Sequence, residues 1–375
     1  MRLHNCLKIG FAITCLSVSL ALSSCIQIEM RDSSTASDID TTDEADTSSQ
    51  TLSQASRKNT LETSTEESVK EVTEVNAKDV LNISICGNIT IDDSIISDAS
   101  NRAGDGKSYS FLRMFTGIYN LVSSSDIAFG SYTEQDKTQL PDEAVGAVYD
   151  LGIDVLNIGN SSAFDTADKY DITEVKEGSE NIVINKNGLN IACLSVSGVD
   201  YKDDKYQSEI EYSDFVSDIV IVFVDWGSDD STADKSNVIY NIAQSGADII
   251  IGNGSALGKI EWVDTGDGTL TLVAYSLGNI ITSSDNIDNL CGGILNLSVA
   301  YGGGTIELDD VTLNPTVIHY TNDDTTGLSG FQVFTLNEYS DEIAANHAVS
   351  DVSVDKLKDK VENIIDEDFL PDYLR

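Results

Sequence analysis

Basic residues are scarce in this sequence. Of its 375 residues only 22 are lysine or arginine, against 63 aspartates and glutamates, and the formal net charge is −41. A surface of this sign repels phosphate backbones, so the composition argues against a nucleic-acid-binding protein. Strong acidity is also typical of proteins adapted for solubility or salt tolerance, so it does not indicate a function by itself.

Histidine is rarer still, with three copies at His4, His319 and His347. The sequence has no Gly-x-Ser-x-Gly elbow and no Ser, His and Asp set at a usable spacing, which excludes a typical serine hydrolase. The glycine run at 302–304 lacks the lysine and helix that follow a phosphate-binding loop. The sequence therefore argues against a serine hydrolase and against a protein with a phosphate-binding loop.

No apolar run is long enough to span a bilayer as a stable helix. The apolar segment Ile9–Leu22 follows the basic residues Arg2 and Lys8 and leads into Leu-Ser-Ser-Cys at 22–25. This arrangement resembles a bacterial lipoprotein signal, which implies that residues 1–25 are a signal peptide and that Cys25 carries a lipid. The expected location is the extracytoplasmic face of the cell membrane, anchored by acyl chains. An ordinary signal peptide with a chance Cys25 is the alternative.

Large apolar residues are almost missing from 26–79, which is rich in Ser, Thr, Asp and Glu. Such a segment cannot bury enough surface to fold, so we interpret it as a disordered acidic tether. The folded domain is then 80–375, and most of the acidic excess lies there. With 41% hydrophobic residues in the whole chain, there is enough apolar material for a core.

Cysteines are few in the predicted domain. Cys86, Cys193 and Cys291 lie in or beside predicted strands, and three thiols cannot all pair. We expect buried free thiols.

The order of apolar patterns predicts an α/β domain, because strand-like runs alternate with helical spacings in its first half. Helices are expected at 110–123, 142–151, 233–245 and 354–365. Strands are expected at 81–86, 126–129, 152–158, 182–185, 189–196, 218–224, 248–251, 270–275, 293–300, 305–313, 316–320 and 331–336.

The stretch Ser245–Ser283 is the most informative part of the chain. Two apolar runs in it, Asp248–Ile251 and Leu270–Tyr275, each stop at a polar loop. In layered α/β proteins such strand ends are where ligand groups converge. The loops at 252–257 and 275–279 are therefore the first candidates for a site.

Short motifs occur in a fixed order along the domain. They are Gly-Asn at 87–88, Ser-Asp-Ile-Ala-Phe at 125–129, Gly-Ile-Asp-Val-Leu-Asn-Ile-Gly-Asn at 152–160, Asp-Trp-Gly at 225–227, Gly-Ala-Asp-Ile-Ile-Ile-Gly at 246–252 and Tyr-Ser-Leu-Gly-Asn at 275–279. Together they resemble the CapA family of poly-γ-glutamate capsule synthesis proteins, from about Leu81 to at least Ala300. The resemblance implies a four-layer α/β/β/α sandwich of the metallophosphatase, or calcineurin-like phosphoesterase, type.

The chain departs from that family at the metal-ligand positions. Gly-Asn at 87–88 stands for Gly-Asp, Ser-Tyr-Thr at 131–133 for Asn-Leu-Glu with Glu134 displaced by one place, and Gly-Asn-Ser-Ser at 159–162 for Ala-Asn-Asn-His. Asp-Trp-Gly-Ser-Asp at 225–229 stands for His-Trp-Gly-x-Glu, and Gly-Asn-Gly-Ser-Ala at 252–256 for Gly-His-His-Pro-His. The resemblance assigns motif positions to Asn88, Asn160, Ser161, Ser162, Asp165, Asp225, Trp226, Gly227, Asn253, Tyr275, Ser276, Gly278 and Asn279.

These replacements bear on cofactors. Two-metal phosphoesterase sites use imidazoles and carboxylates to hold both cations, and no histidine remains at a matched position. We therefore expect no cofactor. The alternative is one hard cation, Ca²⁺, Mg²⁺ or Mn²⁺, on oxygen ligands, for which Asn88, Asp225 and Asn253 are the candidates. These polar residues are also typical of solvated or capping loop positions.

Two functional classes follow. In the first, the protein is a surface lipoprotein of capsule or poly-γ-glutamate biosynthesis with a degenerate metal site, a pseudoenzyme that binds a capsule or cell-wall polymer or a capsule-synthesis protein. In the second, it is a metal-dependent hydrolase or transferase of capsule polymer. Its catalytic candidates are then Asp225, Asp165 and Asn160. The negative charge makes steady binding of a polyanion unfavourable unless cations bridge the two.

Overall fold

The computed structural model describes residues 78–104, 106–134, 140–161, 167–198, 204–227, 232–266 and 268–375. The predicted signal peptide, Cys25 and the tether up to residue 77 lie outside these residues. Within the ranges given, no helix combines the length and the apolar character needed to cross a membrane. The first strand begins at Asp79, one residue before the predicted start of the domain.

Two mixed β-sheets form the folded unit. The larger sheet has the order β14 (Gly327–Thr335), β13 (Thr305–Asp323), β12 (Cys291–Gly302), β1 (Asp79–Ile89), β2 (Ile127–Tyr132), β3 (Val155–Gly159) and β4 (Thr173–Lys176), with β11 (Asn279–Ile281) beside the end of β1. The smaller sheet has the order β5 (Ile182–Lys186), β6 (Leu189–Ser197), β7 (Ile219–Asp225), β8 (Ile249–Asn253), β10 (Leu270–Ala274) and β9 (Ile260–Asp264).

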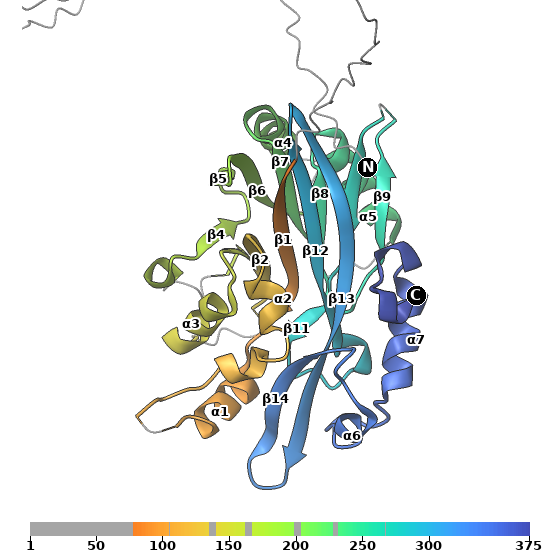
Figure 1. Ribbon diagram of the computed structural model, residues 1–375. Helices are drawn as coiled ribbons and strands as arrows, with labels where there is room; N and C mark the ends of the chain where they lie inside the picture. The colour runs from red at the N-terminus through yellow and green to blue at the C-terminus, as the bar shows by residue number, and fades with distance from the viewer. Residues whose placement is uncertain are drawn as a thin grey trace, which may run out of the picture. The chain divides into compact units, whose positions relative to one another are not determined.

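Seven α-helices accompany the sheets in the described part of the chain. They are α1 (Asp93–Asn101), α2 (Tyr119–Ser123), α3 (Asp142–Leu151), α4 (Asp204–Val216), α5 (Thr232–Gln244), α6 (Asp341–Ala344) and α7 (Val354–Ile364). Figure 1 shows β12 and β13 as long blue strands beside the orange-brown β1. The fold is mixed α/β, which confirms the coarse prediction from sequence.

Strand β1 runs through the middle of the larger sheet, parallel to β2 and antiparallel to β12. Its alternate apolar residues Leu81, Ile83 and Ile85 have no exposed surface. Their alternation with the polar residues Asn82 and Ser84 is the period-two pattern by which the strand was readable from sequence. The strand carries its last polar residue, Asn88, to the edge of the sheet.

The two faces of β7 pack against different groups of residues. Ile219, Ile221 and Phe223 belong to one apolar cluster with the residues of the larger sheet, and the ring centroid of Phe223 lies 6.4 Å from that of Phe129 in β2. Val220, Val222 and Val224 belong to a second cluster, together with Ile210 of α4 and Val238, Ile239 and Ile242 of α5. The period-two alternation of a strand therefore places one face toward the other sheet and one toward helices.

One predicted helix and one pair of predicted strands were wrong in extent. The stretch 110–123, predicted as one helix, holds a short 3₁₀ turn at Leu112–Phe115 and the separate helix α2. A Cβ atom on Gly117, between them, would lie 2.4 Å from the carbonyl oxygen of Val333, so the chain passes β14 there with no room for a side chain. The strands predicted at 305–313 and 316–320 are one strand, β13, which continues through Pro315.

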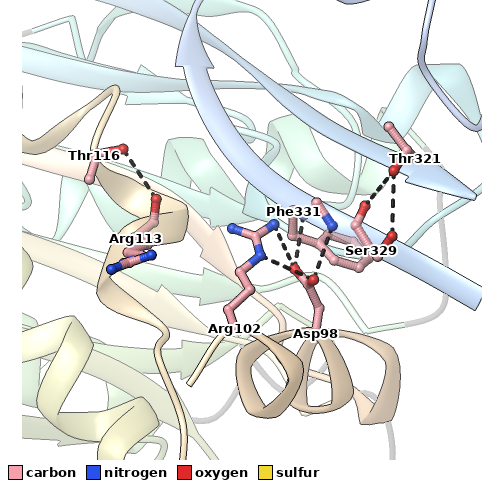
Figure 2. A network of polar contacts seen from close by, with 8 residues as sticks. Asp98, Arg102, Arg113, Thr116, Thr321, Ser329 and Phe331 are labelled. Carbon is pink, nitrogen blue, oxygen red and sulfur yellow. Dashed lines mark hydrogen bonds and ion pairs between the residues drawn. The ribbon is translucent and has the colours of Figure 1, made fainter. Parts of the chain in front are cut away.

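A buried carboxylate links α1 to β14. Asp98 is 2% exposed and accepts hydrogen bonds of 3.0 Å from the backbone N–H groups of Gly330 and Phe331. Arg102, at the end of α1, pairs with the same carboxylate at 2.7 Å. Figure 2 shows Asp98 between Arg102 and the strand that carries Phe331. The contact attaches the helix to the edge strand, since the backbone donors and the guanidinium together compensate the buried charge.

The cysteines of the domain are buried and unpaired, as expected. Cys86, Cys193 and Cys291 are each at most 1% exposed, and none forms a disulfide. Burial raises the pKa of the Cys86 and Cys291 thiols to about 12. They therefore behave as small apolar residues.

Candidate functional site

Polar residues from both sheets meet where the parallel strands end. Asn88 is near the end of β1 and pairs in register with Asn279 of β11, while Asp225 ends β7 and pairs with Asn253 at the end of β8. These four side chains share a cleft of about 520 Å³. Its lining comprises Asn88, Thr90, Thr133, Glu134, Asp225, Gly227, Asn253, Gly254, Ser255, Asn279, Thr282, Ser284 and Asn289.

The Tyr-Ser-Leu-Gly-Asn segment at 275–279 brings Asn279 into the lining of this cleft and is fixed through its backbone. The N–H of Asn88 donates to the carbonyl oxygen of Gly278 at 2.8 Å, and the N–H of Gly293 donates to that of Leu277 at 2.9 Å. Gly278 has a φ of +62°, and a Cβ atom there would lie 2.4 Å from the carbonyl oxygen of Cys291. Glycine is needed because both the conformation and the space exclude a side chain.

The loop after β8 is held by side chains that the sequence had marked as motif positions. The Nδ2 atom of Asn88 and the Oγ atom of Ser276 both donate to the carbonyl oxygen of Gly254, at 2.9 and 2.8 Å. The Nδ2 atom of Asn279 donates to the carbonyl oxygens of Ser255 at 2.6 Å and Asn289 at 3.1 Å. These motif positions thus shape the edge of the site.

The Asp-Trp-Gly motif turns the chain sharply after β7. The backbone N–H of Gly227 donates to Oδ1 of Asp225 at 2.9 Å, and that of Trp226 donates to Oδ1 of Asn253 at 3.1 Å. The Trp226 side chain is 6% exposed and packs into the cluster formed with α5. It therefore serves as part of the core, whereas Asp225 and Gly227 line the cleft.

Tyr275, the first residue of the segment, is outside the described lining and contacts a small polar group. Its hydroxyl donates to Oε1 of Glu261 at 2.8 Å, and the Nζ atom of Lys259 lies 4.5 Å from the ring centroid. Burial, and then the hydrogen bond to Glu261, raise the pKa of the Tyr275 phenol. The phenol stays protonated and holds this corner as a hydrogen-bond donor.

Other predicted residues are placed elsewhere or not described. Asn160 is not among the described lining residues, and its Nδ2 atom donates to a carboxylate oxygen of Glu177 at 2.9 Å. The backbone N–H of Ser161 donates to the carbonyl oxygen of Ile158 at 2.9 Å, which makes it part of a turn. Ser162 and Asp165 lie outside the described residues.

Several lining residues were not predicted as site residues. Thr90 follows β1, Thr133 and Glu134 follow β2, and Thr282 and Ser284 follow β11. These residues could have been found by selecting the first polar residues after every strand of the larger sheet, because these strands end at one edge. For Asn289, which reaches the cleft from the turn at 287–289, the sequence carries no such signal.

The donors present do not fit a pair of metal ions. In the described lining, Glu134 and Asp225 are the charged side chains, and there is no histidine, lysine or arginine. No three side chains of the histidine, cysteine, aspartate and glutamate types gather at metal-binding distances anywhere in the described ranges. A two-cation centre needs more anionic or imidazole ligands than this to balance its charge.

Comparison with known proteins agrees with the motifs. Residues 161–284 match the family model described as bacterial capsule synthesis protein PGA_cap. No curated protein matches the sequence. A crystal structure of a hypothetical protein from Thermus thermophilus is similar at a TM-score of 0.42 and 12% identity, covering 63% of this chain and 98% of that one. Residues 161–284, which contain the Asp-Trp-Gly and Tyr-Ser-Leu-Gly-Asn motifs, are therefore similar to the bacterial capsule synthesis protein family.

Proposed function

We propose that this capsule-synthesis-related protein is a lipid-anchored lipoprotein of the extracytoplasmic face whose cleft binds a ligand without cleaving it. The ligand is a capsule or cell-wall polymer, or a capsule-synthesis protein that carries one. In this proposal the metal site of the family is degenerate and the protein has an accessory role.

One observation supports this proposal above all. The cleft keeps the frame expected of a family member, with Asn88 and Asn253 at the carboxyl ends of β1 and β8 and Asn279 at the start of β11, yet its described lining holds only two carboxylates and no imidazole. The amide nitrogens of Asn88 and Asn279 are already committed to loop carbonyls. Such a lining suits hydrogen bonding to a ligand better than activation of water by cations.

The same proposal includes a four-layer α/β/β/α arrangement of the metallophosphatase type. The alternation along β7 supports it, because Phe223 packs toward the larger sheet while Val222 and Val224 pack with α4 and α5. A crystal structure of the domain would test the arrangement directly.

The experiment that tests the binding role measures the rate of substrate hydrolysis and the metal content of the protein. Purified protein is incubated with bis(p-nitrophenyl) phosphate and with γ-glutamyl oligomers, in the presence of Mn²⁺, Mg²⁺ or Ca²⁺, and its metal content is determined. We expect no hydrolysis above the buffer rate. Hydrolysis that Asp225→Ala abolishes would overturn the proposal.

A second candidate is an enzyme with a single oxygen-ligated cation. It is favoured by the presence of Glu134 and Asp225 in one cleft, because hard cations take carboxylate oxygens. Bound cation stabilises the folded state by mass action, so this candidate requires a rise in melting temperature with added Ca²⁺, Mg²⁺ or Mn²⁺. Asp225→Asn should remove the rise, and Asp309→Asn, on the exposed surface of β13, should not.

A further inference from the structure

We propose that the ligand of the cleft is an uncharged, polyhydroxylated one, a neutral saccharide unit of a polymer. This inference rests on the proposed binding function and names the substrate class of that site. It comes from the way in which donors and acceptors are distributed over the lining.

Two amides of the lining are fixed with their nitrogen ends turned to the protein. The Nδ2 atom of Asn88 donates to the carbonyl oxygen of Gly254 at 2.9 Å, and that of Asn279 donates to Ser255 and Asn289. Both side chains are buried, so these contacts fix their orientation. Asn279 uses both of its amide hydrogens in these bonds and Asn88 uses one of its two, and each amide offers a ligand its acceptor oxygen.

A third amide is fixed in the opposite sense. Oδ1 of Asn253 accepts the backbone N–H of Trp226 at 3.1 Å. Its Nδ2 group, a double donor, is therefore the end that Asn253 offers to a ligand. The cleft thus presents amide acceptors and an amide donor from neighbouring strand ends.

Hydroxyl groups and carboxylates complete the lining. Thr90, Thr133 and Thr282 each contribute a hydroxyl that can donate or accept. Asp225 and Glu134 contribute acceptors only, and one oxygen of Asp225 is already used by the N–H of Gly227. A ligand that matches this lining must donate and accept within a few ångströms.

The charge of the ligand distinguishes anionic, cationic and neutral ligands. An anion only accepts hydrogen bonds, and it would face two carboxylates without a lysine, arginine or histidine in the described lining. An ammonium group only donates, so it would leave the Asn253 amide donor without a partner. A sugar hydroxyl does both. The volume of about 520 Å³ lies within the usual range for small-ligand sites.

The test uses ligands of different charge. Isothermal titration calorimetry is run on the full protein at about 0.5 M salt, which screens its surface charge. The neutral probes are hexasaccharides of glucose, galactose, mannose and N-acetylglucosamine in α and β linkages. The cationic probe is a glucosamine hexamer, and the anionic probes are a galacturonate hexamer and γ-linked hexaglutamate.

We expect at least one neutral hexasaccharide to bind with a Kd below about 1 mM, and the charged probes to bind at least about tenfold more weakly. Thr133→Val and Thr282→Val each remove a lining hydroxyl with little change of shape, and each should weaken binding by roughly three- to tenfold. Thr335→Val, at the end of β14 and outside the described lining, is the matched control.

The proposal is overturned if no neutral hexasaccharide binds at about 5 mM, if a charged probe binds more tightly, or if the lining variants bind like Thr335→Val. This outcome is distinct from failure of the proposed function. Metal-dependent hydrolysis would remove the accessory role and leave the sugar-binding result standing, whereas absence of sugar binding would leave the question of hydrolysis untouched.

Discussion

The indole Nε1 atom of Trp226 donates a hydrogen bond of 2.8 Å to the carbonyl oxygen of Tyr275. The two rings are stacked with centroids 6.5 Å apart, so the turn after β7 is joined to the end of β10 across the intervening strand β8. Gly252 of β8 lies between the two partners. A Cβ atom at that position would be 2.2 Å from Nε1 and 2.3 Å from the Tyr275 oxygen.

Gly252→Ala should therefore disrupt the Trp226–Tyr275 hydrogen bond. Overpacking together with the lost bond should lower the free energy of unfolding by about 2–4 kcal/mol. Urea denaturation followed by circular dichroism measures the change. Gly104→Ala is the control, since a Cβ atom there would meet nothing within 4 Å. Equal stability of the two variants would show that the close approach at Gly252 has no cost.

Much of the site edge was predictable from sequence. The runs at 248–251 and 270–275 are strands β8 and β10, parallel and adjacent, and their loops do reach one cleft. The prediction succeeded because apolar runs that end in glycine and polar residues are strong local signals.

The elements that sequence missed are those with weak local patterns. Helix α4 has exposed aromatic residues at Tyr212 and Phe215 and a single fully buried apolar residue, Ile210, so its sequence lacks an apolar stripe. Helix α1 was missed although Asp92 caps it by accepting hydrogen bonds from the N–H groups of Ser94 and Ile95. Asn289 lies in the cleft because of tertiary contacts, and the spacing of apolar residues in the sequence does not predict such contacts.

Asp98→Asn should weaken the attachment of α1 to β14. The buried carboxylate accepts hydrogen bonds from two backbone N–H groups and pairs with Arg102 (Figure 2). An asparagine amide in its place has no charge to pair with Arg102, and its NH₂ group would face groups that are themselves hydrogen-bond donors. The expected loss is about 2–4 kcal/mol in the free energy of unfolding, measured by urea denaturation.

The matched control for this change is Asp310→Asn, at an exposed carboxylate of β13, which should change the free energy of unfolding by less than about 0.5 kcal/mol. Hydrogen exchange at Gly330 and Phe331 should rise in Asp98→Asn only. Unchanged exchange at those two amides would contradict the assigned role of Asp98.

Cys25→Ala should release the protein from the membrane fraction. The prediction follows from the Leu-Ser-Ser-Cys sequence at 22–25, because a lipoprotein without its acylated cysteine has no acyl anchor. Labelling with a radioactive fatty acid and cell fractionation measure lipidation and location. Cys15→Ala, within the signal, is the control and should stay labelled. Labelled Cys25→Ala protein in the membrane would refute the assignment.

The histidine pair of the domain should make stability depend on pH. The N–H of Val349 donates to Nδ1 of His347 at 2.9 Å, and Nε2 of that ring lies 3.1 Å from the carbonyl oxygen of Ile318, so the neutral ring fits both partners. Burial lowers the pKa of His347. Burial and then the neighbouring His347 lower the pKa of His319 from 6.5 to about 4.

Both groups are neutral in the folded protein and bind protons more readily when it unfolds. The stability that they confer is therefore fully present above pH 6.5 and is lost as the pH falls toward and through about 4. Urea denaturation at pH 7.5 and pH 5 measures this loss in the wild type and in His319→Phe, which has no group to titrate. Falling pH also relieves repulsion among the many carboxylates, so the informative quantity is the difference between the two proteins. The free energy of unfolding of the wild type minus that of His319→Phe should become smaller, or change sign, at pH 5. An equal difference at both pH values would mean that His319 does not contribute to the pH dependence of stability.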